Sequence, residues 1–257
     1  MKIVVCVKTA SGAALSAEDA LQRGGRVGPS LLSPFDKHAV EEALRIAERS
    51  VGGEIAEIVV IAVAPAEALG AVREALGLGA HRAVMLSDPA LEASDLLAVS
   101  RALACLMQRE RADLYLSCSW SGDIDGTMLW VATGERLKLP VLTQARSLVL
   151  SDAVVSIQRQ IESGDLGLSA SLPCLVEVTE TINKPRYATM KGKQAAKSKP
   201  VQILRLADLG LAPGAVGAAT QVLSLAKVVA RRNPVRVEDA KRAPEEIVAF
   251  LEARGLI

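Results

Sequence analysis

The sequence predicts an α/β protein in which a mostly parallel sheet is covered by helices on both faces. Short apolar runs alternate with segments of helical periodicity through the first two thirds of the chain. Hydrophobic residues make up 50% of the 257 residues but aromatic residues only 2%, so aliphatic side chains must form the core. Such a core is typical of a sheet that is buried between helices.

The first strand and the first helix carry the clearest local signals. Apolar residues 3–7 predict a buried strand. Ser33 can cap the next helix, Pro34 suits its first turn and Asp36 favours its dipole. Further strands are expected at residues 58–63, 83–86 and 113–117, and further helices at 66–78, 91–109 and 127–137. This order predicts a Rossmann-like sheet with its ligand crevice at the carboxyl ends of the strands, around Lys8-Thr9, Ala64-Pro65 and residues 118–125.

The pattern changes after about residue 142. Alternating segments at 147–155, 156–162 and 166–170 surround a Ser163-Gly164-Asp165 turn, which predicts a small antiparallel extension. A buried strand follows at 172–178, then a polar, lysine-rich loop at 183–200. The chain then has one more strand, a Gly/Ala/Pro linker and a helix at 244–253. We therefore expect a nucleotide-binding α/β domain over 1–200, and over 201–257 a strand, linker and helical arm against a partner.

Composition excludes several classes of function. Lys and Arg total 30 against 29 Asp and Glu, so no overall positive field attracts nucleic acid. The four cysteines form no CxxC pair and there are only two histidines, which argues against a zinc site and fits a reducing cytoplasm. We expect no targeting segment and no membrane insertion. No catalytic constellation is evident, which favours a carrier or binding subunit over an enzyme.

Residues 118–126 form a polar, glycine-bearing connection between a predicted strand and a predicted helix. The free amides of such a connection can bind phosphate, although Asp123 and Asp125 add negative charge that a phosphate would oppose. An ordinary strand-to-helix connection explains the pattern equally well.

A second candidate is a basic segment that contains Tyr187 and Met190 but no acidic residue. A solvated charged loop is the usual explanation, and RNA binding would need more stacking aromatics. The more specific alternative is a protruding loop whose Met190 enters an apolar pocket of a partner while lysines orient the encounter. The basic residues are Lys184, Arg186, Lys191, Lys193, Lys197 and Lys199.

Several stretches in the right order resemble the beta subunit of electron transfer flavoproteins. The most specific is Asn183-Lys184-Pro185-Arg186-Tyr187-Ala188-Thr189. The others are residues 1–8, 33–36, 39–45, 71–82, Asp113-Leu114 and 159–178, so that the resemblance covers essentially the whole chain.

The resemblance implies an alpha/beta heterodimer that carries electrons from flavin dehydrogenases to a quinone reductase or another acceptor. The redox FAD is then held mainly by the alpha subunit, with Phe35 near the isoalloxazine edge. The beta subunit holds AMP or, in electron-bifurcating relatives, a second FAD. The implied adenosine site comprises Cys6, Lys8, Thr9, Ser33 and Val63, and the implied phosphate loop contains Gly122, Asp123, Asp125, Gly126 and Thr127. The implied partner-recognition residues are Tyr187, Ala188, Thr189, Met190 and Lys191.

The chain also departs from the family pattern. Ser33 stands where Asn is usual before Pro34, and Leu129-Trp130 replaces a Thr-Gly pair in the phosphate loop. That replacement removes a hydroxyl and the residue that best allows close backbone approach. Two alternatives to the ordinary carrier are an electron-bifurcating subunit with its own FAD and a non-redox nucleotide-binding module of the universal-stress type.

Overall fold

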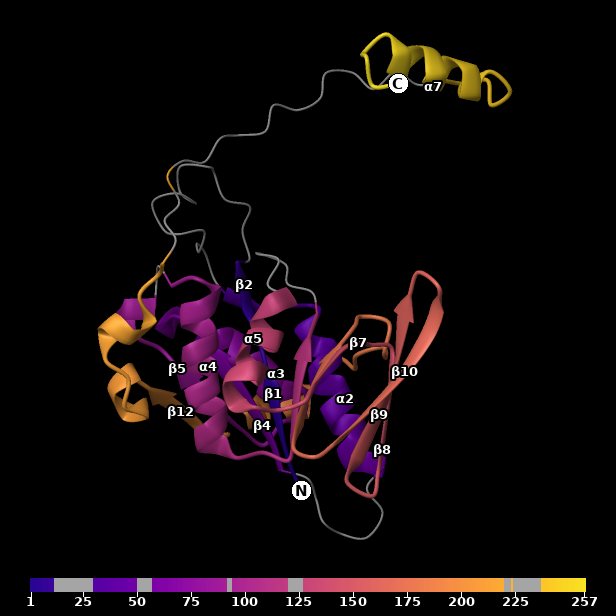
Figure 1. The fold of residues 1–257 in the computed structure, drawn as a ribbon. Coiled ribbons are helices and arrows are strands. Elements are labelled where there is room, and N and C mark those ends of the chain that lie inside the picture. The colour runs from indigo at the N-terminus through magenta and orange to yellow at the C-terminus, as the bar shows by residue number, and fades with distance from the viewer. Residues whose placement is uncertain (12–29, 50–56, 92–93, 120–126, 220–222, 224–236) are drawn as a thin grey trace. The chain divides into compact units, whose positions relative to one another are not determined.

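The computed structural model describes residues 1–11, 30–49, 57–91, 94–119, 127–219, 223 and 237–257. The chain divides into two compact units, Met1–Ser224 and Leu225–Ile257, and each is described by itself. The first unit contains the whole sheet and both layers of helices (Figure 1).

Seven parallel strands form the main sheet of the first unit. Their order across the sheet is β12-β5-β4-β1-β6-β11-β7, and each pair of neighbouring strands is parallel. The strands are β1 (Lys2–Cys6), β4 (Glu57–Val63), β5 (Arg82–Leu86), β6 (Leu114–Cys118), β7 (Val141–Ala145), β11 (Cys174–Val178) and β12 (Val201–Leu204). The fold class predicted from the sequence is therefore confirmed, with β7 as a parallel edge strand that the pattern did not indicate.

Helices cover both faces of this sheet. α2 (Asp36–Arg49) and α3 (Leu69–Leu78) pack on one face, and α4 (Leu96–Glu110) and α5 (Thr127–Leu137) on the other. The alternation of side chains along each strand divides the buried residues into two apolar layers, one under each pair of helices. α4 begins five residues later than the pattern predicted, because Asp95 caps it by accepting a hydrogen bond from the amide of Ala98 at 2.9 Å.

The strand order places a switch point between β1 and β6. The chain runs outward from β1 to β4 and β5, then returns through α4 to β6 on the other side of β1. In open parallel sheets of this kind, ligands bind at the carboxyl ends of the strands beside such a reversal. Short elements complete the unit: β2 (Thr9–Ser11), β3 (Ser30–Leu32), η1 (Ala66–Ala68), η2 (Pro89–Leu91), η3 (Leu206–Leu209) and η4 (Pro213–Val216).

The antiparallel extension is a separate sheet, in the order β10-β9-β8. Its strands are β8 (Ser147–Ser151), β9 (Val154–Ile161) and β10 (Gly164–Ser171). The single segment expected at 147–155 is wrong, because Asp152 and Ala153 adopt positive φ values of 49° and 62° and reverse the chain there. One face of this sheet packs Leu148, Val155 and Ile157 against the core.

The polar loop expected at 183–200 is also corrected. It contains α6 (Met190–Ala196), which packs against α3. Thr189 caps this helix by accepting a hydrogen bond from the amide of Gly192 at 3.0 Å.

The described part of the second unit contains α7 (Ala243–Glu252), close to the helix predicted at 244–253. Its residues Ile247, Val248 and Phe250 are exposed. Among the helices of the described residues, none combines the length and the apolar character that crossing a membrane requires.

Candidate functional site

The carboxyl end of β1 brings several of the expected nucleotide-site residues together at the start of α2. The amide of Lys8 donates to Oδ2 of Asp36, the first residue of α2, at 2.6 Å. Ser33 is buried, and its Oγ accepts a hydrogen bond from the amide of the half-buried Phe35 at 3.3 Å. These bonds fix the turn between β3 and α2 beside the end of β1.

Thr9 and Val63 complete this edge from neighbouring strands. Thr9 pairs with Leu32 in the β2–β3 ribbon, and Val63 ends β4, which is paired with β1. Cys6 is fully buried. Burial, and then the negative charge of Asp36, raise the pKa of the Cys6 thiol far above its ordinary value. Cys6 is therefore a neutral packing residue rather than a nucleophile.

Most of the expected phosphate loop, Gly122, Asp123, Asp125 and Gly126, lies outside the described residues. Thr127 is the first residue of α5. The two residues that depart from the family pattern belong to the core, since Leu129 and Trp130 are both buried. The indole N–H of Trp130 donates to the carbonyl of Cys118 at 3.0 Å, so this side chain fastens α5 to the end of β6.

A buried polar pair lies one strand further along the same edge. Ser117 on β6 and Glu177 on β11 are register partners, so their side chains share the face that α5 covers. Both residues are buried, and Oγ of Ser117 and Oε1 of Glu177 have no hydrogen-bond partner among the described residues. Burial raises the pKa of Glu177 to about 7, although a bond from the backbone of Gln144 opposes the shift.

Arg186 binds residues 183–200, the segment that contains the expected partner-recognition residues, to α2. Its guanidinium donates to both oxygens of Glu41, at 2.7 and 3.1 Å, and to both oxygens of Glu48, at 2.6 and 3.0 Å. Its amide also donates to Glu41 at 3.1 Å. Burial alone would raise the pKa of Glu41, but the hydrogen bonds from Arg186 and Arg45 outweigh it and hold that pKa below its ordinary value. Both carboxylates therefore stay ionised beside the arginine.

Asn183 adds a second attachment to α2 at the start of the same segment. Its Nδ2 donates to the carbonyl of His38 at 2.9 Å and to Glu42 at 3.0 Å. The imidazole of His38 returns a hydrogen bond from Nδ1 to the carbonyl of Asn183 at 3.1 Å. His38 is therefore a structural partner of the segment.

The other end of the segment is bound to α3. Arg73 donates to the carbonyls of Ala196 and Lys199 at 2.6 and 2.7 Å, and Lys199 donates to the carbonyls of Leu76 and Ala80 at 2.9 and 2.6 Å. These bonds satisfy carbonyls at the ends of both helices.

Glycines allow α6 to approach α3 closely. A Cβ on Gly192 would lie 2.5 Å from the carbonyl oxygen of Gly77, which no side chain tolerates without movement of the backbone. The segment is thus fixed in place on both sides.

Within this rigid frame, two large side chains remain in solvent. Tyr187 is 93% exposed and Met190 is 82% exposed, whereas Ala188 is half-buried between them. Thr189 serves as the helix cap, and Lys191 is exposed on the first turn of α6. The residues expected to meet a partner therefore form one continuous surface.

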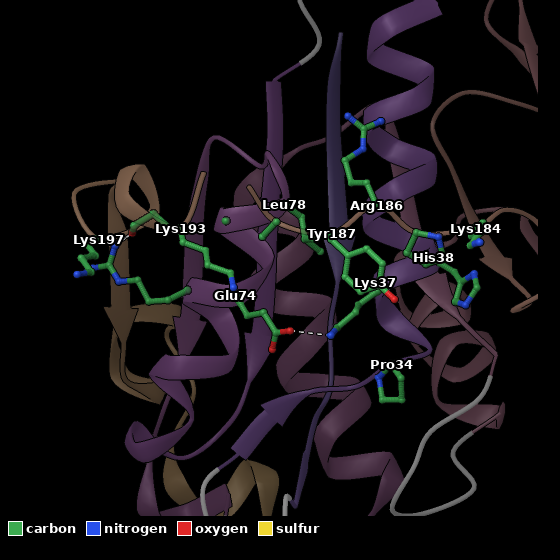
Figure 2. A pocket seen from close by; sticks show the side chains of 15 residues that line it. Pro34, Lys37, His38, Glu74, Leu78, Lys184, Arg186, Tyr187, Lys193 and Lys197 are labelled. Carbon is green, nitrogen blue, oxygen red and sulfur yellow. Dashed lines mark hydrogen bonds and ion pairs between the residues drawn. The ribbon is translucent and has the colours of Figure 1, made fainter. Parts of the chain in front are cut away.

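A cavity of about 830 Å³ opens beside this surface, between α2, α3 and α6 (Figure 2). Leu78, Pro34 and Ala188 form part of its apolar lining. Lys37 and Lys193 point toward Glu74 from opposite sides, and Lys37 pairs with it at 2.6 Å (Figure 2). Lys184, Lys193 and Lys197 also line the cavity, and no ion pair is found for them within the described part of the chain.

Comparison with known proteins assigns the chain to a family. A model of the electron transfer flavoprotein domain matches residues 26–209. Electron transfer flavoprotein subunit beta of Mycobacterium tuberculosis is 33% identical over 233 residues, covering 89% of this chain and 88% of the relative. The bovine (Bos taurus) subunit beta is 32% identical over 228 residues, covering 88% and 86%.

A third relative is the caffeyl-CoA reductase-Etf complex subunit CarD of Acetobacterium woodii. It is 34% identical over 190 residues, covering 74% of this chain and 71% of the relative. The chain belongs to the electron transfer flavoprotein family. Within it, the chain is a beta subunit with a role in electron transfer, and its relatives' names imply a partner subunit.

Sequence reasoning missed the contacts that hold the surface. Two missed features do have a signal in the sequence. Thr189 is a residue type that often caps a helix, and Glu177 is a charged residue within an apolar strand, which is unusual for a carboxylate. The bonds from Arg186 to Glu41 and Glu48 join positions too far apart in sequence for any local pattern to indicate them.

Proposed function

We propose that this chain pairs with an electron transfer flavoprotein alpha subunit and carries electrons from flavin dehydrogenases to a quinone reductase or another acceptor. The redox FAD would be held mainly by the alpha subunit, with Phe35 near its ring. The observation that carries the proposal is the rigid surface on which Tyr187 and Met190 stand in solvent. A carrier needs such a docking surface and no acid, base or nucleophile of its own.

The carboxyl edge between β1 and β6 is the proposed place of a second nucleotide, either AMP or FAD. The chain fits the nucleoside part of such a ligand, because the orphaned buried oxygens of Ser117 and Glu177 lie near this edge and can accept hydrogen bonds from hydroxyls or amines. Cys6, Lys8, Thr9, Ser33 and Val63 would surround it. The bound nucleotide would supply shape and negative charge at the edge, and residues 122–127 would meet its phosphate.

The remaining proposals concern the arm and the compartment. Residues 201–257 were expected to pack on the alpha subunit. The strand of this region, β12, pairs with β5 in the main sheet, and the helical arm would pack on the alpha subunit, which the exposed apolar residues Ile247, Val248 and Phe250 of α7 support. We propose a cytoplasmic location, and the four free cysteine thiols support it because the cytoplasm is reducing. We propose that the chain is an electron carrier subunit rather than an enzyme in its own right.

The test is to produce the chain together with its alpha partner and to identify the small molecules released on denaturation. The ordinary carrier predicts one FAD per heterodimer, with AMP, and reduction of the flavin by at least one dehydrogenase. Two FAD molecules per heterodimer would favour the bifurcating alternative. The similarity to a subunit of a reductase complex is the observation that supports this alternative. A colourless chain that forms no heterodimer would favour the universal-stress type instead.

A further inference from the structure

We propose that the cavity between α2, α3 and α6 receives an acidic side chain of the dehydrogenase that docks on Tyr187 and Met190, with Lys193 as its ion-pair partner. The inference deepens the proposed function, because it assumes that a dehydrogenase docks on this surface. It adds a receiving cavity and a specific charge to the protruding residues.

Positively charged side chains outnumber negatively charged ones around the cavity. The only acidic side chain among its lining residues, all of which the structure describes, is Glu74 of α3, and Lys37 of α2 already pairs with it at 2.6 Å. Arg186 is neutralised by Glu41 and Glu48, and Arg73 donates to backbone carbonyls. Besides Arg73, the lining cations that pair with no acidic side chain of the described residues are Lys184, Lys193 and Lys197.

Lys193 is the best placed of these lysines. Its side chain lines the cavity and points from α6 toward Glu74, as Figure 2 shows, but the ion pair of Glu74 is with Lys37. α6 cannot easily rotate, because Thr189 caps it, Arg73 holds the carbonyl of its last residue and Gly192 lies against Gly77. A cation held on such a fixed helix loses little freedom when it forms an ion pair, which strengthens binding.

The surroundings favour a protein as the occupant rather than a free small anion. Tyr187 lines the cavity and is 93% exposed, and Met190, 82% exposed, begins the helix that carries Lys193. Exposed Tyr and Met are the residue types enriched in protein interfaces. Leu78 and Pro34 would contact the methylene groups of an aspartate or glutamate whose carboxylate reaches Lys193.

The first experiment measures reduction of the wild-type heterodimer and of its variants by a dehydrogenase that reduces the wild type. Lys193→Glu should raise KM about tenfold at low salt, with kcat and flavin content unchanged, and Lys193→Arg should stay close to wild type. Lys138→Glu is the matched control, because Lys138 follows α5 on the other face of the sheet and is 79% exposed. High salt should reduce the difference between Lys193→Glu and wild type.

The second experiment locates the partner's acid directly. A water-soluble carbodiimide condenses a lysine amine with a contacting carboxylate into an amide, and the oxygen that is lost leaves as the urea of the reagent. Mass spectrometry should find Lys193 linked to an Asp or Glu of the dehydrogenase, and a Tyr187→Ala, Met190→Ala heterodimer should lose that link.

An unchanged KM for Lys193→Glu would overturn the inference, as would crosslinks that join the dehydrogenase only to other lysines. If inorganic phosphate or citrate binds the isolated heterodimer at Lys193 and no crosslink to the dehydrogenase forms, the cavity is a small-anion site and the inference is wrong. If no dehydrogenase reduces the wild-type heterodimer, the proposed function fails and the inference falls with it.

Discussion

Arg186 and Glu41 are joined by three hydrogen bonds, two from the guanidinium and one from the backbone amide of the arginine. Because Glu41 is buried, its carboxylate depends on Arg186 and Arg45 for compensation of its charge. The same contact fixes the residue immediately before Tyr187. This ion pair thus contributes both to the stability of this region and to the position of the exposed surface.

Replacing this arginine should therefore affect docking more than flavin content. Arg186→Lys keeps the charge but cannot make the forked contacts to Glu41 and Glu48, and we expect a loss of about 1 kcal/mol of stability because Arg186 is partly exposed. Reduction by a dehydrogenase should slow while the heterodimer retains its flavin. Stopped-flow reduction with flavin absorbance checks both points. Arg146→Lys, whose exposed side chain bonds Gln160, is the control.

Met190→Ala should slow reduction by a dehydrogenase without loss of flavin. Its side chain is 82% exposed, so the folded state loses little packing, while a bound partner would lose an apolar contact. Val149→Ala removes a comparably exposed apolar side chain, at 63%, from the separate antiparallel sheet. Equal reduction rates for wild type and Met190→Ala would remove the docking role from this residue.

Two glycine substitutions should change stability in opposite directions. Gly192→Ala places a Cβ 2.5 Å from the carbonyl oxygen of Gly77, so α6 must shift, at a cost of about 1–3 kcal/mol. Gly70→Ala, within α3, meets nothing within 4 Å and should stabilise the protein by about 0.5–1 kcal/mol through helix propensity. Urea unfolding followed by circular dichroism measures both. A stabilised Gly192→Ala variant would contradict the close helix contact.

Glu177 should make stability depend on pH near neutrality. Burial raises the pKa of Glu177 to about 7, so the folded state keeps a proton that the unfolded chain releases at lower pH. The stability linked to this proton is fully present below the ordinary glutamate pKa and is lost as pH rises through about 7. The loss amounts to about 3 kcal/mol at most.

The matched variant is Glu177→Gln, which keeps the shape and removes the titration. Unfolding free energies at pH 5 and pH 8 should differ less for the variant than for wild type. Carboxylates such as Glu41 and Glu110, whose pKa values lie below the ordinary range despite their burial, act in the opposite direction at lower pH and are common to both proteins. Parallel pH profiles for the two proteins would contradict the assignment.

The sheet was predictable because its signals are local. The apolar runs at β1, β4, β5 and β6 lie where the sequence places them, and α2 begins at Asp36, shortly after the start predicted at Ser33-Pro34. α6 was not predictable, since it is only 7 residues long, contains Gly192 and packs through a close approach to Gly77. The turn at Asp152-Ala153 was missed because neither residue is a glycine, although both adopt positive φ.

The site was predictable only in part. The motif ending at Thr189 located the exposed surface, and the buried character of Cys6 followed from its apolar strand. The cavity and its charge balance could not be predicted, because they combine side chains from α2, α3 and α6. The roles of the nucleotide-site residues and the recognition residues stay predictions.

The connection from β11 to β12 links strands near opposite borders of the main sheet, so residues 183–200 must travel across the layer formed by α2 and α3. Residues 183–200 thereby cross over both helices. Asn183 and Arg186 bond this segment to α2 at one end, and Lys199 bonds it at the end of α3 at the other. A partner that exerts force on residues 183–200 would therefore act on α2 and α3 through these hydrogen bonds, and breaking the bonds would uncover both helices.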